Sequence, residues 1–231
     1  MSRYKLRANY DIENIDSQKM DGTVIVDVPM LSNGELNYGL SHIKKKLYEE
    51  NVYPSEIGFD IMSLATMVYM ADTRIERVVH GQDSWTREIE LEIPVSNVEI
   101  WDSQIRTVER MLKFLTGDLW KITLSSRAWQ FNNLEEVREK SNKYDEVSLF
   151  SGGMDSLIST INLMENKKNT LLISHAGEGL TKNAQKNIVN KFDLLYPDVL
   201  HTWLDLWMVF PRDYIPAGGN DNNTRSRSFL F

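Results

Sequence analysis

The residues Ser-Gly-Gly-Met-Asp-Ser at positions 151–156 constrain the fold of this chain more than any other segment. An apolar run at positions 147–150 precedes them and is predicted to be a buried strand. After the loop, apolar residues recur at the spacing of a helix, at Leu157, Ile158, Ile161 and Met164. A strand, a glycine-bearing loop and a helix in this order present free N–H groups and the positive end of a helix dipole to an anion. The segment therefore predicts a phosphate-binding loop.

The two adjacent glycines, Gly152 and Gly153, let the backbone take conformations closed to other residues and approach a ligand closely. An ordinary Gly-Gly turn between a strand and a helix is the alternative interpretation. The sequence does not contain G-x-x-x-x-G-K-[ST], so the loop is not of the Walker type. We favour a nucleotide site, because the flanking strand and helix are those that such a site needs.

Composition narrows the class of protein. The length of 231 residues allows one large domain or two small ones, and a net charge of −7 gives no overall case for nucleic-acid binding, leaving only a local basic patch open. The chain has no cysteine, which removes disulfides, thiolate catalysis and cysteine-ligated zinc. No run of eighteen apolar residues and no signal-peptide pattern is present, so we expect a cytoplasmic protein without a membrane partner.

Residues 1–130 are predicted to form a smaller α+β domain, followed by a polar linker at 131–145. Strands are predicted at 4–10, 23–28, 85–93 and 120–124, and helices at 36–50, from 54 onward and at 105–115, where Gly117 could close the last one. Within 85–93 apolar residues alternate with glutamates. This alternation indicates a sheet with one wet face and favours antiparallel strands.

Residues 146–231 are predicted to form a parallel α/β domain. Apolar runs at 147–150, 170–174 and 200–209 alternate with helical segments at 157–165 and 181–195. Such runs are typical of a parallel sheet covered on both faces, in which ligands bind beyond the carboxyl ends of the strands. We therefore expect the loop, residues 174–177 and the stretch after Phe210 to converge on one site.

The loop, read after its strand, resembles the phosphate loop of the PP-loop ATP pyrophosphatases. That superfamily includes GMP synthetase, asparagine synthetase, tRNA-lysidine synthetase and 7-cyano-7-deazaguanine synthase (QueC). Its members cleave ATP to AMP and pyrophosphate while adenylating a carboxylate, amide or carbonyl oxygen. The resemblance implies a PP-loop domain of the adenine nucleotide alpha hydrolase type, an AMP-forming ligase or synthetase activity, and ATP and Mg²⁺ as cofactors.

Within the superfamily the chain is most similar to QueC-like proteins of the QatC antiphage-defence group. The likeness lies in residues 149–157, 172–175 and 224–231, and in the N-terminal half in residues 59–72, 85–88 and 114–118. It implies a role in antiphage defence, with a deazapurine or a protein substrate from the same operon as the partner. A 7-cyano-7-deazaguanine synthase of deazapurine biosynthesis and a non-catalytic nucleotide-binding subunit are the alternatives.

The resemblance also assigns roles to single residues. Those expected to hold the ATP phosphates through amides and hydroxyls lie at the strand end and in the loop: Phe150, Ser151, Gly152, Gly153 and Ser156. Asp155 would bind Mg²⁺, and His175 would lie beside the adenosine, at the end of the second strand. Arg227 would bind phosphate with both arms of its guanidinium, with Arg225 as a second candidate for the same task. The predicted catalytic residues are Asp155, Ser156 and Arg227.

Two features depart from the family pattern. The synthases named above carry a cysteine-ligated zinc, which is not expected from this chain because it has no cysteine. The sequence also reaches Phe231 after three of the usual strands, so we expect a C-terminally incomplete PP-loop domain whose missing part holds the rest of the sheet and the substrate pocket.

Two further predictions do not depend on the resemblance. Asp205 lies in an apolar run and is either a functional acid or a residue that reaches water near a strand edge. Trp101, Trp120 and Trp129 are expected to pack the first domain.

Overall fold

The computed structural model describes residues 3–12, 14–128, 130–131, 143–175, 179–208, 210–211, 215, 224–226 and 229. The chain divides into two compact units. Unit 1 comprises Met1–Asn37, Pro54–Glu135 and Phe210–Leu230, and unit 2 comprises Tyr38–Tyr53, Glu136–Val209 and Phe231. Each unit therefore takes in separate stretches of the chain, whereas the domains predicted from the sequence are continuous and stay a prediction.

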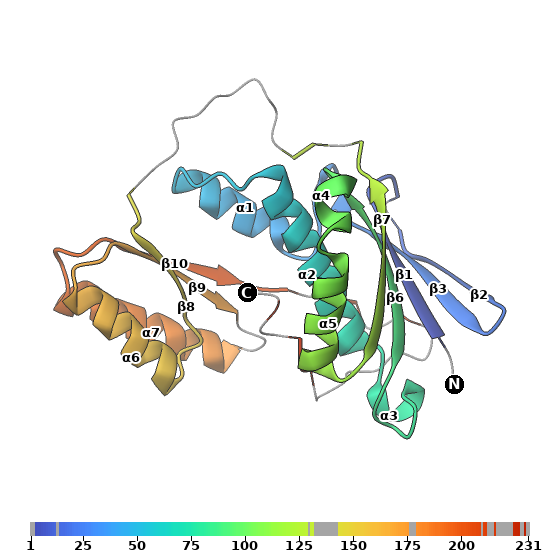
Figure 1. The fold of residues 1–231 in the computed structure, drawn as a ribbon. Coiled ribbons are helices and arrows are strands. Elements are labelled where there is room, and N and C mark those ends of the chain that lie inside the picture. The colour runs from blue at the N-terminus through green and yellow to red at the C-terminus, as the bar shows by residue number, and fades with distance from the viewer. Residues whose placement is uncertain are drawn as a thin grey trace. The chain divides into compact units, whose positions relative to one another are not determined.

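Unit 1 is built on a five-stranded sheet in the order β2-β3-β1-β6-β7. Its strands are β1 (Arg3–Asn9), β2 (Asp16–Met20), β3 (Thr23–Pro29), β6 (Glu88–Val95) and β7 (Leu119–Ser126). The helices α2 (Glu56–Arg74), α4 (Val98–Asp102) and α5 (Ile105–Thr116) lie on one side of this sheet (Figure 1). The single turn α3 (Arg77–His80) precedes β6, and β4 (Leu31–Ser32) and β5 (Glu35–Leu36) form a separate two-stranded hairpin.

The direction of the strands corrects the antiparallel sheet predicted for this region. β1 is parallel to β3 and β6, β6 is parallel to β7, and among the described strands of this sheet only the β2–β3 pair is antiparallel. The face away from the helices carries ion pairs between neighbouring strands: Arg3–Glu88, Lys5–Glu92 and Lys121–Glu90. The glutamates of β6 therefore mark the face of the sheet that the helices do not cover, and their alternation with apolar residues does not depend on strand direction.

Local signals set the ends of the helices in unit 1. The Ser55 hydroxyl caps α2 by accepting a hydrogen bond from the N–H of Gly58 at 3.1 Å. α5 ends at Gly117, whose φ of 77° is left-handed, which confirms the predicted glycine cap. Trp101 and Trp120 are buried as predicted, while Trp129 lies outside the described residues.

Unit 2 contains the parallel sheet that the sequence predicts. Its strands β8 (Glu146–Leu149), β9 (Thr170–His175) and β10 (His201–Leu206) lie in the order β10-β9-β8, and both pairs are parallel. The strand at 147–150 is not buried as expected, because β8 lies at the edge of the sheet: Val147 and Leu149 are 64% and 50% exposed, and only Phe150 is buried.

The connecting helices α6 (Met154–Glu165) and α7 (Gly179–Leu195) lie on one side of this sheet (Figure 1). They share a hydrophobic core that includes Phe150, Met164, Leu172, Val189 and Phe192. The helix α1 (Leu40–Glu49) packs against β10.

The chain is thus a mixed α/β protein whose main sheets are mostly parallel. Because β8, β9 and β10 run in one direction, their carboxyl ends share one edge of the sheet, which is where parallel sheets bind ligands. In the described part of the chain, every helix is too short or too polar to cross a lipid bilayer.

Candidate functional site

The glycine loop joins the carboxyl end of β8 to the first turn of α6. The N–H of Phe150 donates to the C=O of Ile173 at 2.7 Å, which continues the pairing with β9 beyond the strand. The helix begins where the N–H of Leu157 donates to the C=O of Gly153 at 3.0 Å. The first N–H groups of a helix, here from Met154 onward, have no acceptor within the helix. They provide the donors that an anion needs.

Two serine hydroxyls lie across the loop from each other. Ser151 Oγ and Ser156 Oγ are 3.1 Å apart. The N–H of Gly153 donates to Ser151 Oγ at 3.2 Å, and Ser156 Oγ donates to the C=O of Gly153 at 2.9 Å. A hydroxyl can rotate its hydrogen toward a new acceptor. The loop therefore gathers two adaptable hydroxyls and a main-chain amide at an exposed turn.

Gly152 is the position in the loop that requires a glycine. Its φ of 81° is left-handed, and a Cβ added to it would lie 3.1 Å from Cγ of Gln185. Gly153 has a φ of −80°, and a Cβ there would meet only Ser151 Oγ at 3.4 Å. The close approach of the backbone to α7 is thus made at Gly152.

Replacing Gly152 with alanine is expected to lower the free energy of unfolding by about 2 kcal/mol, because the left-handed backbone disfavours a Cβ and the new methyl displaces Gln185. Gly22→Ala is a matched control, since Gly22 has a φ of 78° but nothing within 4 Å of its Cβ position. The control is expected to lose about 1 kcal/mol, the backbone term alone. Chemical denaturation measures both losses, and an equal loss at the two positions would contradict the tight contact with Gln185.

Side chains from the neighbouring elements bind the carbonyl oxygens at the start of the loop. Ser174 Oγ of β9 donates to the C=O of Phe150, and Trp203 Nε1 of β10 donates to Ser174 Oγ at 2.8 Å. Gln185 Nε2 of α7 donates to the C=O of Ser151 at 3.0 Å. Gln185 is not among the residues predicted from the sequence. Its position on the buried face of α7, with Val189 and Phe192, is the signal that could have identified it.

Asp155 lies in the first turn of α6 with its side chain exposed. Among the described residues, no group of three or more His, Cys, Asp or Glu side chains is placed to hold a metal ion. Mg²⁺ does not need such a group, because it is usually held by one or two carboxylates together with substrate phosphates and water. The carboxylate of Asp155 therefore fits a Mg²⁺ ion that arrives with the phosphates of ATP.

His175 and Asp205 lie at the carboxyl ends of the other two strands, where Asp205 is in register with Ser174. His175 is only 2% exposed, so contact with an adenosine would require its surroundings to open. The Asp205 carboxylate binds Nζ of both Lys46 and Lys182. Burial raises the pKa of Asp205, but hydrogen bonds and charge from the two lysines outweigh burial and hold the pKa below 3.8. The pairing explains how a mostly buried carboxylate is tolerated here.

Asp205→Asn is expected to lower the free energy of unfolding by about 2 kcal/mol at neutral pH, because two charge-assisted hydrogen bonds are weakened. The pKa of Asp205 is depressed in the folded state, so its stabilising effect is present above the ordinary value of 3.8 and is lost as the pH falls through the folded value. Denaturation of wild type and variant should therefore show a difference in stability that is constant near neutral pH and shrinks as the pH falls below 3.8. A difference independent of pH would refute the ion pairs.

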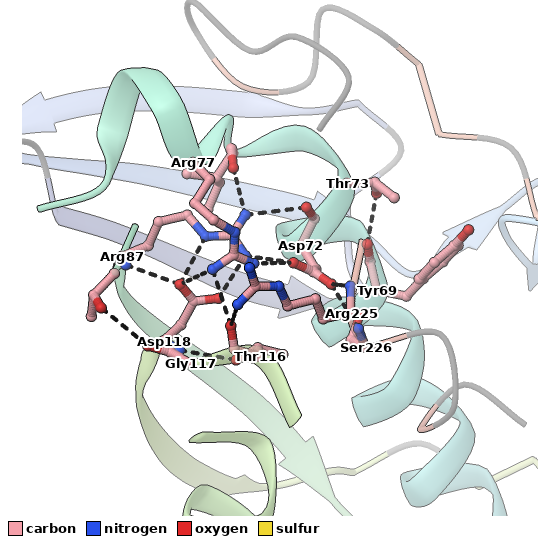
Figure 2. Close-up of polar contacts among 12 residues, drawn as sticks. Tyr69, Asp72, Thr73, Arg77, Arg87, Thr116, Gly117, Asp118, Arg225 and Ser226 are labelled. Carbon is pink, nitrogen blue, oxygen red and sulfur yellow. Dashed lines mark hydrogen bonds and ion pairs between the residues drawn. The ribbon is translucent and has the colours of Figure 1, made fainter. Parts of the chain in front are cut away.

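Arg225 and Ser226 of the C-terminal motif contact residues of unit 1 (Figure 2). The guanidinium of Arg225 lies 4.2 Å from the centroid of the Trp85 ring and donates to the C=O of Thr116 at 3.1 Å. The N–H groups of Arg225 and Ser226 donate to Asp72 Oδ2 at 2.7 and 2.8 Å. The glycine loop belongs to unit 2, so the phosphate-binding role of Arg225 stays a prediction. Arg227 lies outside the described residues.

Asp72 also belongs to a buried ion cluster with Asp118, Arg77 and Arg87 (Figure 2). Asp118 binds Nη1 of Arg77 at 2.7 Å and Nη2 of Arg87 at 2.6 Å, and Asp72 binds Nη2 of the same two arginines at 3.0 and 2.5 Å. Burial alone would raise the pKa of Asp72, but Arg87 and the Ser226 groups outweigh it and lower the pKa. Two carboxylates and two guanidiniums balance in charge, so we interpret the cluster as part of the structural core of unit 1.

Comparison of the chain with protein-family models, curated proteins and solved structures gave no match. The structure gathers five of the predicted site residues on one turn: Ser151, Gly152, Gly153, Asp155 and Ser156. Phe150 is fully buried beneath that turn, and its N–H and C=O are already bonded to Ile173 and Ser174, so its contact with a ligand stays a prediction.

The predicted convergence of strand ends is seen for the loop and for Ser174 and His175, which end neighbouring parallel strands. Residues 176–178 lie outside the described part of the chain. Phe210, after which the third segment was expected, accepts a hydrogen bond from Arg74 within unit 1.

Proposed function

We propose that this protein is a QueC-like, ATP-dependent enzyme of the PP-loop type, which adenylates an acid or carbonyl substrate, releases pyrophosphate and works in antiphage defence. The observation that carries the proposal is the loop at residues 151–156, where main-chain amides and two hydroxyls gather at the start of α6 behind a parallel strand. The resemblance of its sequence to the PP-loop family supplies the reaction class.

In the proposed reaction, an oxygen of the substrate attacks the α-phosphorus of ATP. A new P–O bond forms as the bond to the β-phosphate oxygen breaks, so the adenylyl group is transferred and pyrophosphate leaves with the bonding electrons. The loop would bind the β- and γ-phosphates, so its amides and the hydroxyls of Ser151 and Ser156 would stabilise the charge of the leaving group. Asp155 would hold Mg²⁺, which supplies further positive charge when bound. Positioning and charge neutralisation would do this chemistry without a covalent nucleophile.

We propose only the chemical class of the substrate that accepts the adenylyl group. A deazapurine carboxylate or a carbonyl of a protein substrate from the same operon would supply the attacking oxygen. A 7-cyano-7-deazaguanine synthase would run the same adenylation in deazapurine biosynthesis, and its acid substrate, 7-carboxy-7-deazaguanine, is therefore a useful probe of both proposals.

The nature of the products tests the reaction class. The protein is incubated with Mg²⁺–ATP, with and without 7-carboxy-7-deazaguanine, and the nucleotides are separated by anion-exchange chromatography. AMP with an equal amount of pyrophosphate is the expected result, because an amine such as ammonia added to the incubation, or water, attacks the adenylated substrate and displaces AMP as the leaving group. ADP with phosphate would contradict an adenylation and would favour another class of ATPase.

A nucleotide-binding subunit without turnover is the second candidate. The engagement of Arg225 with Trp85 and Thr116 favours it, because one of the two arginines predicted to bind phosphate already has partners in unit 1. This candidate predicts that calorimetry detects ATP binding while neither AMP nor pyrophosphate accumulates. Steady release of pyrophosphate would rule it out.

A further inference from the structure

We propose that Gln185 is a positioning residue that holds the glycine loop in its anion-binding conformation before a ligand arrives. The identity of that ligand rests on the proposed function, whereas the conformation of the loop does not. The inference starts from the burial of Gln185: its side chain lies on α7 and is 0% exposed. Burying an amide is unfavourable unless its polar groups are hydrogen-bonded, so its contacts define what it does.

The amide NH₂ group of Gln185 ties two elements together. Nε2 donates to the C=O of Ser151 at 3.0 Å and lies 3.5 Å from the C=O of His175 at the end of β9. Oε1 is buried and has no hydrogen-bond partner among the described residues. The side chain is therefore held by what its NH₂ group donates, and the shorter of the two bonds is to the loop.

Gln185 also supports the loop from below. Its Cγ is the atom nearest to the Cβ position of Gly152, at 3.1 Å, so the left-handed turn rests directly on the side chain. The preceding carbonyl, that of Phe150, is bound by Ser174 Oγ. Two successive carbonyl oxygens of the loop are thus fixed by buried side chains.

These two carbonyl bonds determine where the amides of the loop point. In a trans peptide the C=O and the N–H lie on opposite sides of the plane. Because the carbonyls of Phe150 and Ser151 are directed to buried donors, the N–H groups of Ser151 and Gly152 are turned away from the interior, toward the exposed side where an anion would bind. Gln185 therefore supplies preorganisation, which lowers the cost of ordering the loop on binding.

Three variants test this role. Gln185→Met keeps the length of the side chain but removes the donor, and Gln185→Glu can donate to Ser151 only when the introduced carboxyl group is protonated. Asn187→Met is the matched control, because Asn187 is an exposed amide on the same helix. The readouts are ¹⁵N order parameters of residues 151–153 in the ligand-free protein, and calorimetric affinities for inorganic tripolyphosphate and for Mg²⁺–ATP at pH 5.5 and 8.

We expect Gln185→Met to lower the order parameters of the loop and to weaken tripolyphosphate binding about fivefold to tenfold, and the control to leave both unchanged. Gln185→Glu should match Gln185→Met at pH 8 and recover toward wild type at pH 5.5, a dependence that a purely structural role would not produce. A loop in Gln185→Met as ordered as in wild type would overturn the inference. Failure of the wild type to bind Mg²⁺–ATP would instead refute the proposed function, while the order parameters would still decide the role of Gln185.

Discussion

Asp155→Ala is expected to slow the release of pyrophosphate from Mg²⁺–ATP by about a hundredfold or more, because a bound metal contributes several kcal/mol of charge stabilisation and Asp155 would be its protein ligand. The fold should be retained, since Asp155 is exposed in the first turn of α6. Loss of a negative charge near a helix N-terminus costs only about 0.3–1 kcal/mol. The measurement is the initial rate of pyrophosphate release, and the affinity for ATP with and without Mg²⁺ is measured alongside it.

Asp198→Ala is the matched control for this experiment, because Asp198 is an exposed aspartate of unit 2 outside the loop. It should release pyrophosphate at the wild-type rate. In the wild type, Mg²⁺ should strengthen ATP binding more than it does in Asp155→Ala. Equal rates and equal Mg²⁺ dependence in wild type and Asp155→Ala would remove Asp155 from the site and the proposed mechanism with it.

Asp72→Ala is expected to lower the free energy of unfolding by about 3–5 kcal/mol, since removing one member of a buried ion pair leaves an uncompensated charge. Both Arg77 and Arg87 would lose a carboxylate, and the N–H groups of Arg225 and Ser226 would lose their shared acceptor. A domain is stabilised by only about 5–15 kcal/mol in total, so the loss is large enough to unfold part of the protein at moderate temperature.

Asp27→Ala supplies the comparison for Asp72→Ala. Asp27 pairs with Arg7 at 2.5 Å, but both side chains keep part of their surface in solvent. Exposed pairs of this kind contribute about 1 kcal/mol or less. Urea denaturation followed by circular dichroism measures both variants. If Asp72→Ala cost no more than Asp27→Ala, the ion cluster would not be the structural core of unit 1 that its geometry indicates.

Features with a local physical cause could be predicted from the sequence. The start of a helix near residue 54 and its end at Gly117 can be predicted, because a helix boundary needs only the residues of the adjacent turn. The strand, loop and helix around residues 151–156 were predicted for the same reason. The parallel direction of β8, β9 and β10 followed from apolar runs that alternate with helices.

Features that depend on distant partners could not be predicted. The alternation of apolar residues and glutamates in β6 favours antiparallel pairing, yet β6 is parallel to both of its neighbours and the glutamates lie on the face of the sheet away from the helices. Asp72, Arg87 and Asp118 lie far apart in the sequence, and no local sequence pattern predicts the ion pairs between them. Gln185 could have been noticed as a polar residue in an apolar stripe, but its partner, the carbonyl of Ser151, is visible only in the structure.

The central claim is that residues 151–156 bind the phosphates of ATP, and an NMR titration of the ¹⁵N-labelled protein with Mg²⁺–ATP tests it most directly. We predict that the largest chemical-shift changes fall on the amides of Gly152, Gly153, Met154, Asp155 and Ser156, with smaller changes at His175. We also predict that tripolyphosphate reproduces the changes in the loop but not those at His175, because it has no adenosine. A titration that leaves the loop amides unmoved at saturating ATP would contradict the account.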